Sequence, residues 1–235
     1  MALGHTVGEL KPTARAGGRI PIAIVHSTAP VIAITTAAFK AEFPGAALRH
    51  LLDSSLYDEL DGTAAARRRL GTRLEHLIDL AAGAEPAAIL VACSSYPRVV
   101  DRLGLRGSGP AGIPIVHPDA AMYAETRASG AVRVGVLASV PDAAEAAAYS
   151  VMRAYAPATP EVTTHVVDRA RPGVDELLAH GARTLVAGGA EAIALAQYSL
   201  APAVRAIAAA VDVPVFSGPL AAARGLRTLL IDASR

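Results

Sequence analysis

The chain has 235 residues, of which 52% are apolar and 18% are charged, and its formal net charge at pH 7 is only +1. This length allows one large domain or two small lobes, and the balanced charge without a long basic run argues against nucleic acid as a partner. No apolar run reaches the length of about 18 residues that a membrane span needs, and residues 1–18 lack the apolar core of a signal peptide. A single cysteine excludes an internal disulfide, so we expect a cytoplasmic protein that is not bound to a membrane.

The first half of the chain alternates between apolar runs and helix-like patterns. A continuous apolar run is typical of a strand covered on both faces, whereas apolar residues at helical spacing indicate an amphipathic helix. In chain order the sequence predicts a loose tail over 1–18, a strand over 20–25, a helix over 31–42, a strand over 46–52, a helix over 63–82, a strand over 89–92, a helix to about 105, a strand over 113–116 and a helix to about 129.

The same order of elements begins again after residue 130. In chain order we expect a strand over 132–138, a helix to about 155, a strand over 162–167, a helix over 173–180, a strand over 192–196, a helix behind residues 197–199, a strand over 213–216 and a last helix to about 230. Residues 25–28 align with 137–140, and residues 91–95 align with 195–199. These parallels indicate a duplicated unit.

Strands that alternate with helices predict an α/β fold of mostly parallel sheets flanked by helices. The duplication predicts two pseudo-symmetric lobes. The first would span 19–118 and be completed by a C-terminal helix over 218–235, and the second would span 119–217. Ligands of open α/β sheets bind beyond the carboxyl ends of the strands. We therefore expect a cleft between the lobes, lined by residues that follow the strands.

Cys93 stands where a buried strand meets the expected start of a helix. Orphan N–H groups and the dipole at a helix N-terminus lower the pKa of a thiol from about 8.5 toward neutrality. The same N–H groups, together with the hydroxyls of Ser94 and Ser95, could hold a substrate carboxylate. The alternative is that Cys93 only fills apolar space in the core, as free cysteines often do.

Hydroxyl, amide and imidazole groups follow the other strands and suit a small carboxylate held without a metal. The candidate substrate-binding residues are His26, Ser27, Thr28, Ser94, Ser95, Ser139, Gln197, Tyr198 and Ser199. Such hydroxyls also cap helices, and both roles are compatible. His117 is a further candidate because it ends a strand. Asp53 and Asp119 could accept a substrate ammonium, but we favour helix caps.

A glycine-rich motif needs separate treatment. Residues 107–112 match the dinucleotide pattern G-x-G-x-x-G, but they precede a strand and Pro110 interrupts them. The structural context that this motif requires is therefore missing, and we expect no nucleotide cofactor. No histidine, cysteine and carboxylate cluster has the spacing of a metal site, so no metal is expected either.

The chain resembles the aspartate/glutamate/hydantoin racemase superfamily, which includes maleate isomerases and arylmalonate decarboxylases. The resemblance extends from about Ile20 to Leu230 and rests on residues 25–28, 51–56, 90–95, 113–117, 134–138 and 195–201. It implies two pseudo-symmetric lobes with a cofactor-free active site between them, and relatives commonly form dimers. Typical members carry one cysteine in each lobe, and the two thiols act on opposite faces of a carbon next to a carboxylate.

The sequence departs from that pattern at one position. Cys93 matches the first cysteine, but the second position falls within 196–199, which contains no thiol. Racemisation by two thiols is therefore not available, and tyrosine and serine are poor bases. We expect a cofactor-independent racemase or isomerase of a small acid or amino acid that uses Cys93. The alternatives are a decarboxylase in which Cys93 donates the proton, and a carboxylate-binding protein without catalysis.

Overall fold

A computed structural model describes residues 18–58, 63–94, 109–168 and 172–231. The first half contains β1 (Ile20–His26), α1 (Pro30–Glu42), β2 (Ala46–Leu52), α2 (Ser55–Asp58), α3 (Ala64–Ala82), β3 (Ala88–Val91), the 3₁₀ helix η1 (Pro110–Gly112), β4 (Ile115–Val116) and α5 (Ala120–Ala128). The second half contains β5 (Arg133–Ala138), α6 (Pro141–Tyr155), β6 (Glu161–Val166), α7 (Val174–Ala187), β7 (Ala192–Leu195), the 3₁₀ helix η2 (Tyr198–Ala203), α8 (Val204–Ala208), β8 (Val215–Ser217) and α9 (Gly218–Leu230).

Some expectations fall outside the described residues. They are most of the N-terminal tail, Ser95, the helix expected to run to about 105, the first two residues of the 107–112 motif and the last four residues of the expected C-terminal helix.

The described strands form two parallel four-stranded sheets, as the alternation of strands and helices predicts. The first sheet has the order β2-β1-β3-β4 and the second has the order β6-β5-β7-β8. Each strand of the first sheet therefore has a counterpart four strands later along the chain. The predicted α/β fold and the predicted duplication are both confirmed.

Helices cover both faces of the first sheet. Alternate residues of β1 belong to different cores, since Ile24 packs with Phe39 of α1 whereas Val25 packs with Leu74 of α3. Period-2 alternation in a strand sends neighbouring side chains to opposite faces, so an unbroken apolar run is buried on both sides. Helix α3 begins at its N-cap Thr63, whose side chain accepts a hydrogen bond from the Ala66 N–H.

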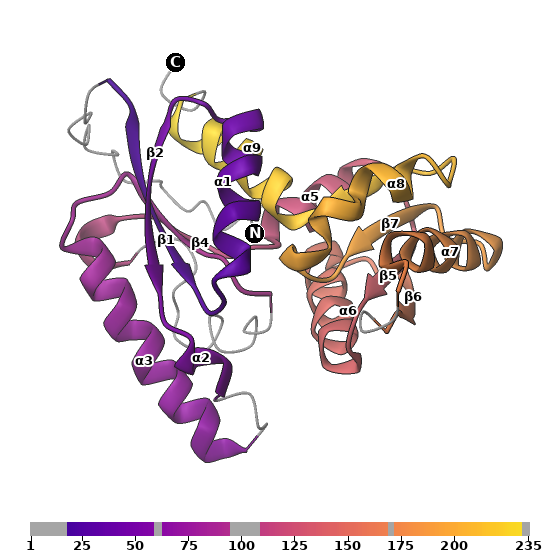
Figure 1. Cartoon of the computed structure of the whole chain (residues 1–235), viewed down its shortest axis with the longest axis horizontal. Coiled ribbons are helices and arrows are strands. Elements are labelled where there is room, and N and C mark those ends of the chain that lie inside the picture. Colours follow the sequence, from indigo (N-terminus) through magenta and orange to yellow (C-terminus); the bar gives the residue numbers. More distant parts are fainter. Residues whose placement is uncertain (1–17, 59–62, 95–108, 169–171, 232–235) are drawn as a thin grey trace.

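The last helix, α9, lies between the two halves and packs against both. Figure 1 shows α9 running from α1 toward α5, between the two groups of strands. Ala222 and Leu226 of α9 belong to the core on the first sheet, whereas the neighbouring Ala221 belongs to the core on the second sheet. The buried apolar surface of one helix therefore joins the two halves of the chain.

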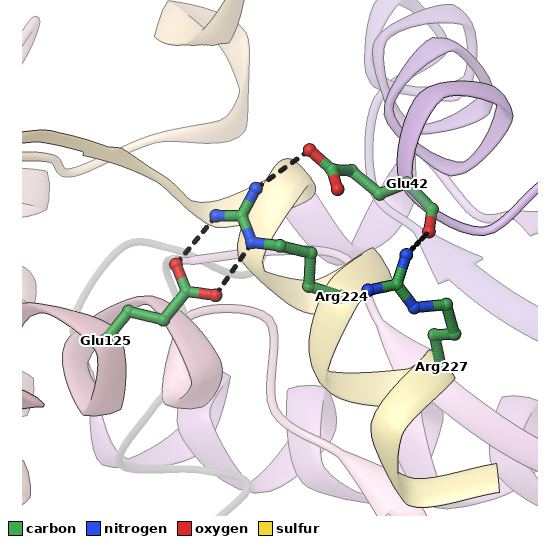
Figure 2. A network of polar contacts seen from close by, with 4 residues as sticks. All are labelled: Glu42, Glu125, Arg224 and Arg227. Carbon is green, nitrogen blue, oxygen red and sulfur yellow. Dashed lines mark hydrogen bonds and ion pairs between the residues drawn. The ribbon is translucent and has the colours of Figure 1, made fainter. Parts of the chain in front are cut away.

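A polar network reinforces this junction. Arg224 of α9 donates to the Glu42 carboxylate of α1 at 2.9 Å and to both carboxylate oxygens of Glu125 of α5, at 2.9 and 2.7 Å (Figure 2). Arg227, one turn further along α9, donates to the backbone carbonyl of Glu42 at 2.8 Å. The Arg224 side chain is 34% exposed, so these ion pairs orient the helices more than they stabilise the fold.

The structure corrects several predicted boundaries. His26 is the last residue of β1 and not the first residue of a loop, and β4 is shorter than expected. The segment behind residues 197–199 begins as a 3₁₀ helix, η2, with Pro202 inside it, before the short α8. Helix α7 continues to Ala187, seven residues beyond the predicted end at 180. Among the described residues, no helix is long and apolar enough to cross a membrane.

Candidate functional site

The candidate site begins at the carboxyl end of β3. Cys93 follows this strand by two residues, is half-buried and packs at the edge of the core between the first sheet and α3. The Ser27 hydroxyl, which follows β1, donates a hydrogen bond to Cys93 Sγ at 3.2 Å. Parallel pairing of β1 with β3 brings these two residues together, although 66 positions separate them in the sequence. A donor at this distance favours the negatively charged thiolate over the neutral thiol.

The equivalent position in the second sheet holds an amide. Gln197 follows β7 as Cys93 follows β3, and its Oε1 accepts hydrogen bonds from the backbone N–H and the hydroxyl of Ser139, at 2.8 and 2.9 Å. Ser139 follows β5, the counterpart of β1, so the pair Ser139–Gln197 occupies the same topological place as the pair Ser27–Cys93. Both hydrogen bonds use the amide oxygen, which leaves the amide nitrogen of Gln197 as a donor.

Tyr198 connects the two sets of strand ends. Its ring belongs to the core on the first sheet, together with Ala92, although η2 follows a strand of the second sheet. The Tyr198 hydroxyl donates to the backbone carbonyl of Pro118 at 3.0 Å. Burial raises the pKa of Tyr198 well above its usual value, and negative charge on Asp119 and Cys93 adds to the rise. Tyr198 therefore lies close enough to both groups to sense their charge.

The two aspartates that follow strands differ in their roles. Asp53 accepts hydrogen bonds from the backbone N–H and the hydroxyl of Ser55 at the start of α2, as a cap should, and it pairs with Arg73. The prediction that Asp119 caps the following helix is wrong. Asp119 precedes α5, but its side chain makes no capping hydrogen bond, and only 2% of the residue is exposed.

The Asp119 carboxyl instead lies against the start of α9 and the ring of Tyr198, since a β-carbon added to Gly218 would lie 2.6 Å from Asp119 Oδ1 and 2.5 Å from Tyr198 Cε1. Burial raises the pKa of Asp119 to about 7, and the hydroxyl of Ser94 opposes this rise. Among the described residues, neither Ser94 Oγ nor Asp119 Oδ1 has a hydrogen-bond partner. Asp119 is therefore a buried carboxyl group that changes its charge near neutral pH.

His26 is enclosed and is paired with another histidine. Its Nε2 lies 2.9 Å from Nδ1 of His50 on β2, and His50 Nε2 lies 3.3 Å from the hydroxyl of Thr36 on α1. Burial, together with the nearby His50, lowers the pKa of His26 to about 4. The only His26 ring atom without a hydrogen-bond partner among the described residues is Nδ1. His26 is therefore neutral at physiological pH.

The remaining predicted residues lie around these groups. Thr28 is half-buried, and its carbonyl accepts the N–H of Val31 at the start of α1. Ser199 is half-buried in η2. His117 is buried, and its Nδ1 accepts the backbone N–H of Asp119 at 3.4 Å. Among the described residues, no hydrogen bond joins Thr28 or Ser199 to Cys93, so their role stays a prediction.

A cavity of about 480 Å³ lies elsewhere, between α5 and α6. Its lining is His117, Ala120, Tyr123, Ala124, Arg127, Ala128, Ser150, Arg153 and Ala154. Neither Cys93 nor Gln197 lines it, but His117 and Tyr123, two residues that lie next to Asp119, do. Within the part of the chain that the structure describes, no group of three or more histidines, cysteines and carboxylates could hold a metal ion.

Sequence reasoning missed three polar residues of this region. They are His50, Tyr123 and Ser217, and only Ser217 stood in a segment that the sequence marks as a strand end. Tyr123 lies within α5 and His50 lies within β2, and nothing in the sequence of either element indicates a functional residue. Their places follow from pairing and packing over long sequence distances.

Comparisons with known proteins agree with this architecture. The chain resembles a glutamate racemase from Francisella tularensis subsp. tularensis SCHU S4 in complex with D-glutamate, with a TM-score of 0.64, 17% identity, and coverage of 92% of this chain and 83% of that chain. It resembles a maleate cis-trans isomerase from Nocardia farcinica, with a TM-score of 0.61, 19% identity, and coverage of 89% and 92%. A mutant arylmalonate decarboxylase matches with a TM-score of 0.51, 16% identity, and coverage of 86% and 89%.

At these identities the likeness shows a shared fold and not a shared reaction. A sequence search of curated proteins finds no significant match. The family model for Asp/Glu/Hydantoin racemase, however, matches residues 22–226, which include strands of both sheets and the first part of α9. The chain therefore belongs to the Asp/Glu/Hydantoin racemase family.

Proposed function

We propose that the chain is a cofactor-independent isomerase that acts next to the carboxylate of a small acid or amino acid, with Cys93 as its reactive group. The observation that carries this proposal is the hydrogen bond from Ser27 to Cys93 Sγ at the carboxyl end of β3. A half-buried thiol that accepts a hydrogen bond is suited to react as a thiolate, and this is the form that acts as base or nucleophile. Membership of a racemase family supports the same reading.

The substrate carboxylate would lie between the two sets of strand ends. The amide nitrogen of Gln197 is a donor, because both of its hydrogen bonds with Ser139 use the oxygen. Donors that are fixed before the substrate arrives stabilise the charge that develops on a carboxylate when the neighbouring carbon loses a proton. We propose that Gln197, with Ser139 fixing its orientation, holds this carboxylate opposite Cys93.

A single thiol permits two kinds of isomerisation. As a base, the Cys93 thiolate takes the proton from the carbon next to the carboxylate, and the electron pair of the C–H bond moves into the carboxylate. As a nucleophile, the sulfur adds to one carbon of a C=C bond, the remaining single bond rotates, and loss of the sulfur restores the double bond. The maleate isomerase relative, a cysteine-to-serine mutant, carries a covalently bound succinylcysteine intermediate, which is an example of the second route in that protein.

Decarboxylation is a second candidate, and the lone thiol favours it. The expected position of the second cysteine falls within 196–199, which contains no thiol, so the chain has one thiol with which to protonate one face of a carbanion. In that reaction the bond to the departing carbon dioxide breaks, its electron pair moves into the remaining carboxylate, and Cys93 returns a proton to the carbon. Both reactions need the same sulfur and the same donors.

The test is a panel of substrates in deuterated water, followed by proton NMR and optical rotation. The panel contains both enantiomers of aspartate and glutamate, maleate, and substituted malonates. Deuterium exchange with loss of optical activity, or conversion of maleate to fumarate, supports the isomerase. Carbon dioxide release with one-sided deuterium incorporation supports the decarboxylase and overturns the isomerase.

The matched variants are Cys93→Ala and Ser129→Ala. Cys93→Ala should lower turnover by at least about 100-fold, the range seen when a proton-transfer group is removed. Ser129, whose hydroxyl donates to the Thr126 carbonyl at the end of α5, is remote from the thiol, and its variant should keep full turnover. Turnover that survives in Cys93→Ala would remove the sulfur from the mechanism.

A further inference from the structure

The cavity between α5 and α6 extends from the surface to buried residues. Its volume of about 480 Å³ falls within the range of about 300–1,000 Å³ that is typical of small-molecule sites. The lining includes the exposed side chains of Arg127 and Arg153. It also includes His117 and Tyr123, which are only 7% and 2% exposed. The cavity is therefore deeper than a gap between two surface side chains.

Small side chains keep this space open. Ala120, Ala124 and Ala128 follow one another at intervals of four residues on α5, so they lie on one face of that helix. Ala154 lines the cavity from α6. A side chain that ends at the β-carbon does not fill the space between the helices. The methyl groups therefore give the cavity apolar walls and leave its volume to a ligand.

Arg127 brings a positive charge to the cavity from α5. Its Nη1 donates to the backbone carbonyl of Ala154 at 3.1 Å, so the guanidinium reaches across to α6. A guanidinium has five N–H donors in one plane, and this hydrogen bond uses one of them. No carboxylate among the described residues forms an ion pair with Arg127. Its other donors therefore suit an oxyanion, which a guanidinium binds through two parallel hydrogen bonds.

Arg153 brings a second positive charge from α6. Its Nη1 donates to the hydroxyl of Tyr149, one turn earlier, at 3.2 Å, and its Cζ lies 5.9 Å from the centre of the Tyr149 ring. This contact holds the Arg153 side chain against its own helix. Among the described residues that line the cavity, none is an aspartate or a glutamate. The charge around the cavity is therefore positive.

We propose that this cavity is a second ligand site, which takes a small organic anion whose carboxylate or phosphate group contacts Arg127 and Arg153. The anion would offset the repulsion between the two guanidiniums as well as accept their hydrogen bonds. The organic part of the ligand would lie along the alanine face and against Tyr123. Neither Cys93 nor Gln197 lines the cavity, so the proposal does not depend on the reaction at the strand ends.

The first test is isothermal titration calorimetry with phenyl phosphate, benzoate and benzamide. All three probes carry the same ring, but benzamide carries no charge. At least one of the two anions should bind at least about tenfold more tightly than benzamide, because hydrogen bonds to charged groups are the stronger ones. Tighter binding of phenyl phosphate would assign the site to phosphate esters, and tighter binding of benzoate would assign it to carboxylic acids. Failure of both anions to bind, or equal binding of benzamide, would overturn the proposal.

The same titration on alkylated protein locates the site. Iodoacetamide modifies the only thiol of the chain, Cys93, and blocks the region next to it. Because Cys93 does not line the cavity, the alkylated protein should bind the anion with the affinity of the unmodified protein, within about twofold. Loss of binding after alkylation would place the anion at the strand ends and overturn the proposal.

Charge variants test the two guanidiniums. Arg127→Gln and Arg153→Gln should each weaken anion binding on the order of tenfold and leave benzamide unaffected. Arg205→Gln is the matched control, because Arg205 is an exposed arginine on α8 that does not line the cavity. Its affinity should stay within about twofold of the wild type. An equal loss in all three variants would indicate a general effect of net charge, and no loss in the first two would equally overturn the proposal.

A variant that fills the space tests the cavity itself without a change of charge. Ala124 is exposed, so Ala124→Met should fold normally, which circular dichroism would verify. The longer side chain should occupy the cavity and weaken anion binding at least about tenfold. Ala206→Met, at an exposed position of α8, is the matched control and should bind like the wild type. Wild-type affinity in folded Ala124→Met would overturn the proposal.

Discussion

Gly218, the first residue of α9, allows Asp119 and Tyr198 to lie where they do. A β-carbon at this position would lie 2.5 Å from Tyr198 Cε1 and 2.6 Å from Asp119 Oδ1, far inside van der Waals contact. Neither neighbour is the free end of a flexible chain, because the Tyr198 hydroxyl is bonded to the Pro118 carbonyl and Asp119 is buried. Gly218→Ala must therefore displace a ring, a carboxyl group or the start of α9.

The expected cost follows from two opposing effects. Overpacking of a fixed core costs about 1–3 kcal/mol, whereas alanine gains up to about 1 kcal/mol over glycine in a helix. The free energy of unfolding should therefore fall by about 1–2 kcal/mol, which for a chain of this length lowers Tm by roughly 2–8 °C. Scanning calorimetry and urea unfolding would measure both quantities. Turnover should fall as well, because the displaced Tyr198 packs in the same core as Ala92, the residue before Cys93.

Gly83→Ala is the matched control. Gly83 ends α3 with ordinary helical φ, and its β-carbon would lie 3.5 and 3.7 Å from the nearest atoms, the carbonyl oxygens of Leu80 and Asp79. Its stability should change by no more than about 0.5 kcal/mol. A Gly218→Ala protein that is as stable and active as this control would refute the packing argument around Asp119.

Three further changes test other contacts. Tyr198→Phe should lower the free energy of unfolding by about 1–3 kcal/mol in urea titrations, because the Pro118 carbonyl loses its buried donor; an unchanged value would contradict this. Arg224→Gln should lower the free energy of unfolding by about 1 kcal/mol at low salt. The loss should be smaller at about 0.5 M salt, which screens exposed ion pairs, and a loss that does not depend on salt would argue against ion pairing. In the unfolded state His26 takes up a proton near pH 6.5, whereas the buried side chain takes it up only near pH 4. The free energy of unfolding should therefore fall by up to about 3 kcal/mol as the pH is lowered from 6.5 to 4. His26→Asn should remove most of this pH dependence, and an equally steep dependence in the variant would contradict the assignment.

The order of elements could be predicted because local patterns determine it. Unbroken apolar runs such as β1 and the helical spacing of α3 define their own boundaries, and the prediction of two parallel sheets follows from their alternation. The predicted end of α7 at residue 180 was wrong because of one glycine. Gly181 reads as a helix stop, but a β-carbon there would lie 2.7 Å from His165 and 2.9 Å from Leu137. The glycine therefore lets α7 pack closely on the sheet without ending it.

The site could be predicted only in part. Cys93 and Ser27 both follow strands, and parallel pairing brings such residues to one edge, so their contact follows from topology. The pairing of His26 with His50 depends on the register between β1 and β2, which the sequence does not show. The place of Asp119 depends on α9, which returns from the far end of the chain. An aspartate before a helix usually caps it, but Asp119 does not, because the start of α9 lies against its side chain.

The most direct test of the account is the loss of turnover during alkylation of the single cysteine. Intact-protein mass spectrometry would follow the addition of one iodoacetamide group while turnover of the active substrate is assayed in the same samples. We predict that activity disappears with the rate constant of the mass shift, that substrate slows both, and that Ser27→Ala slows alkylation because its thiolate loses a donor. Protein that carries the adduct at Cys93 and keeps full turnover would contradict the central claim.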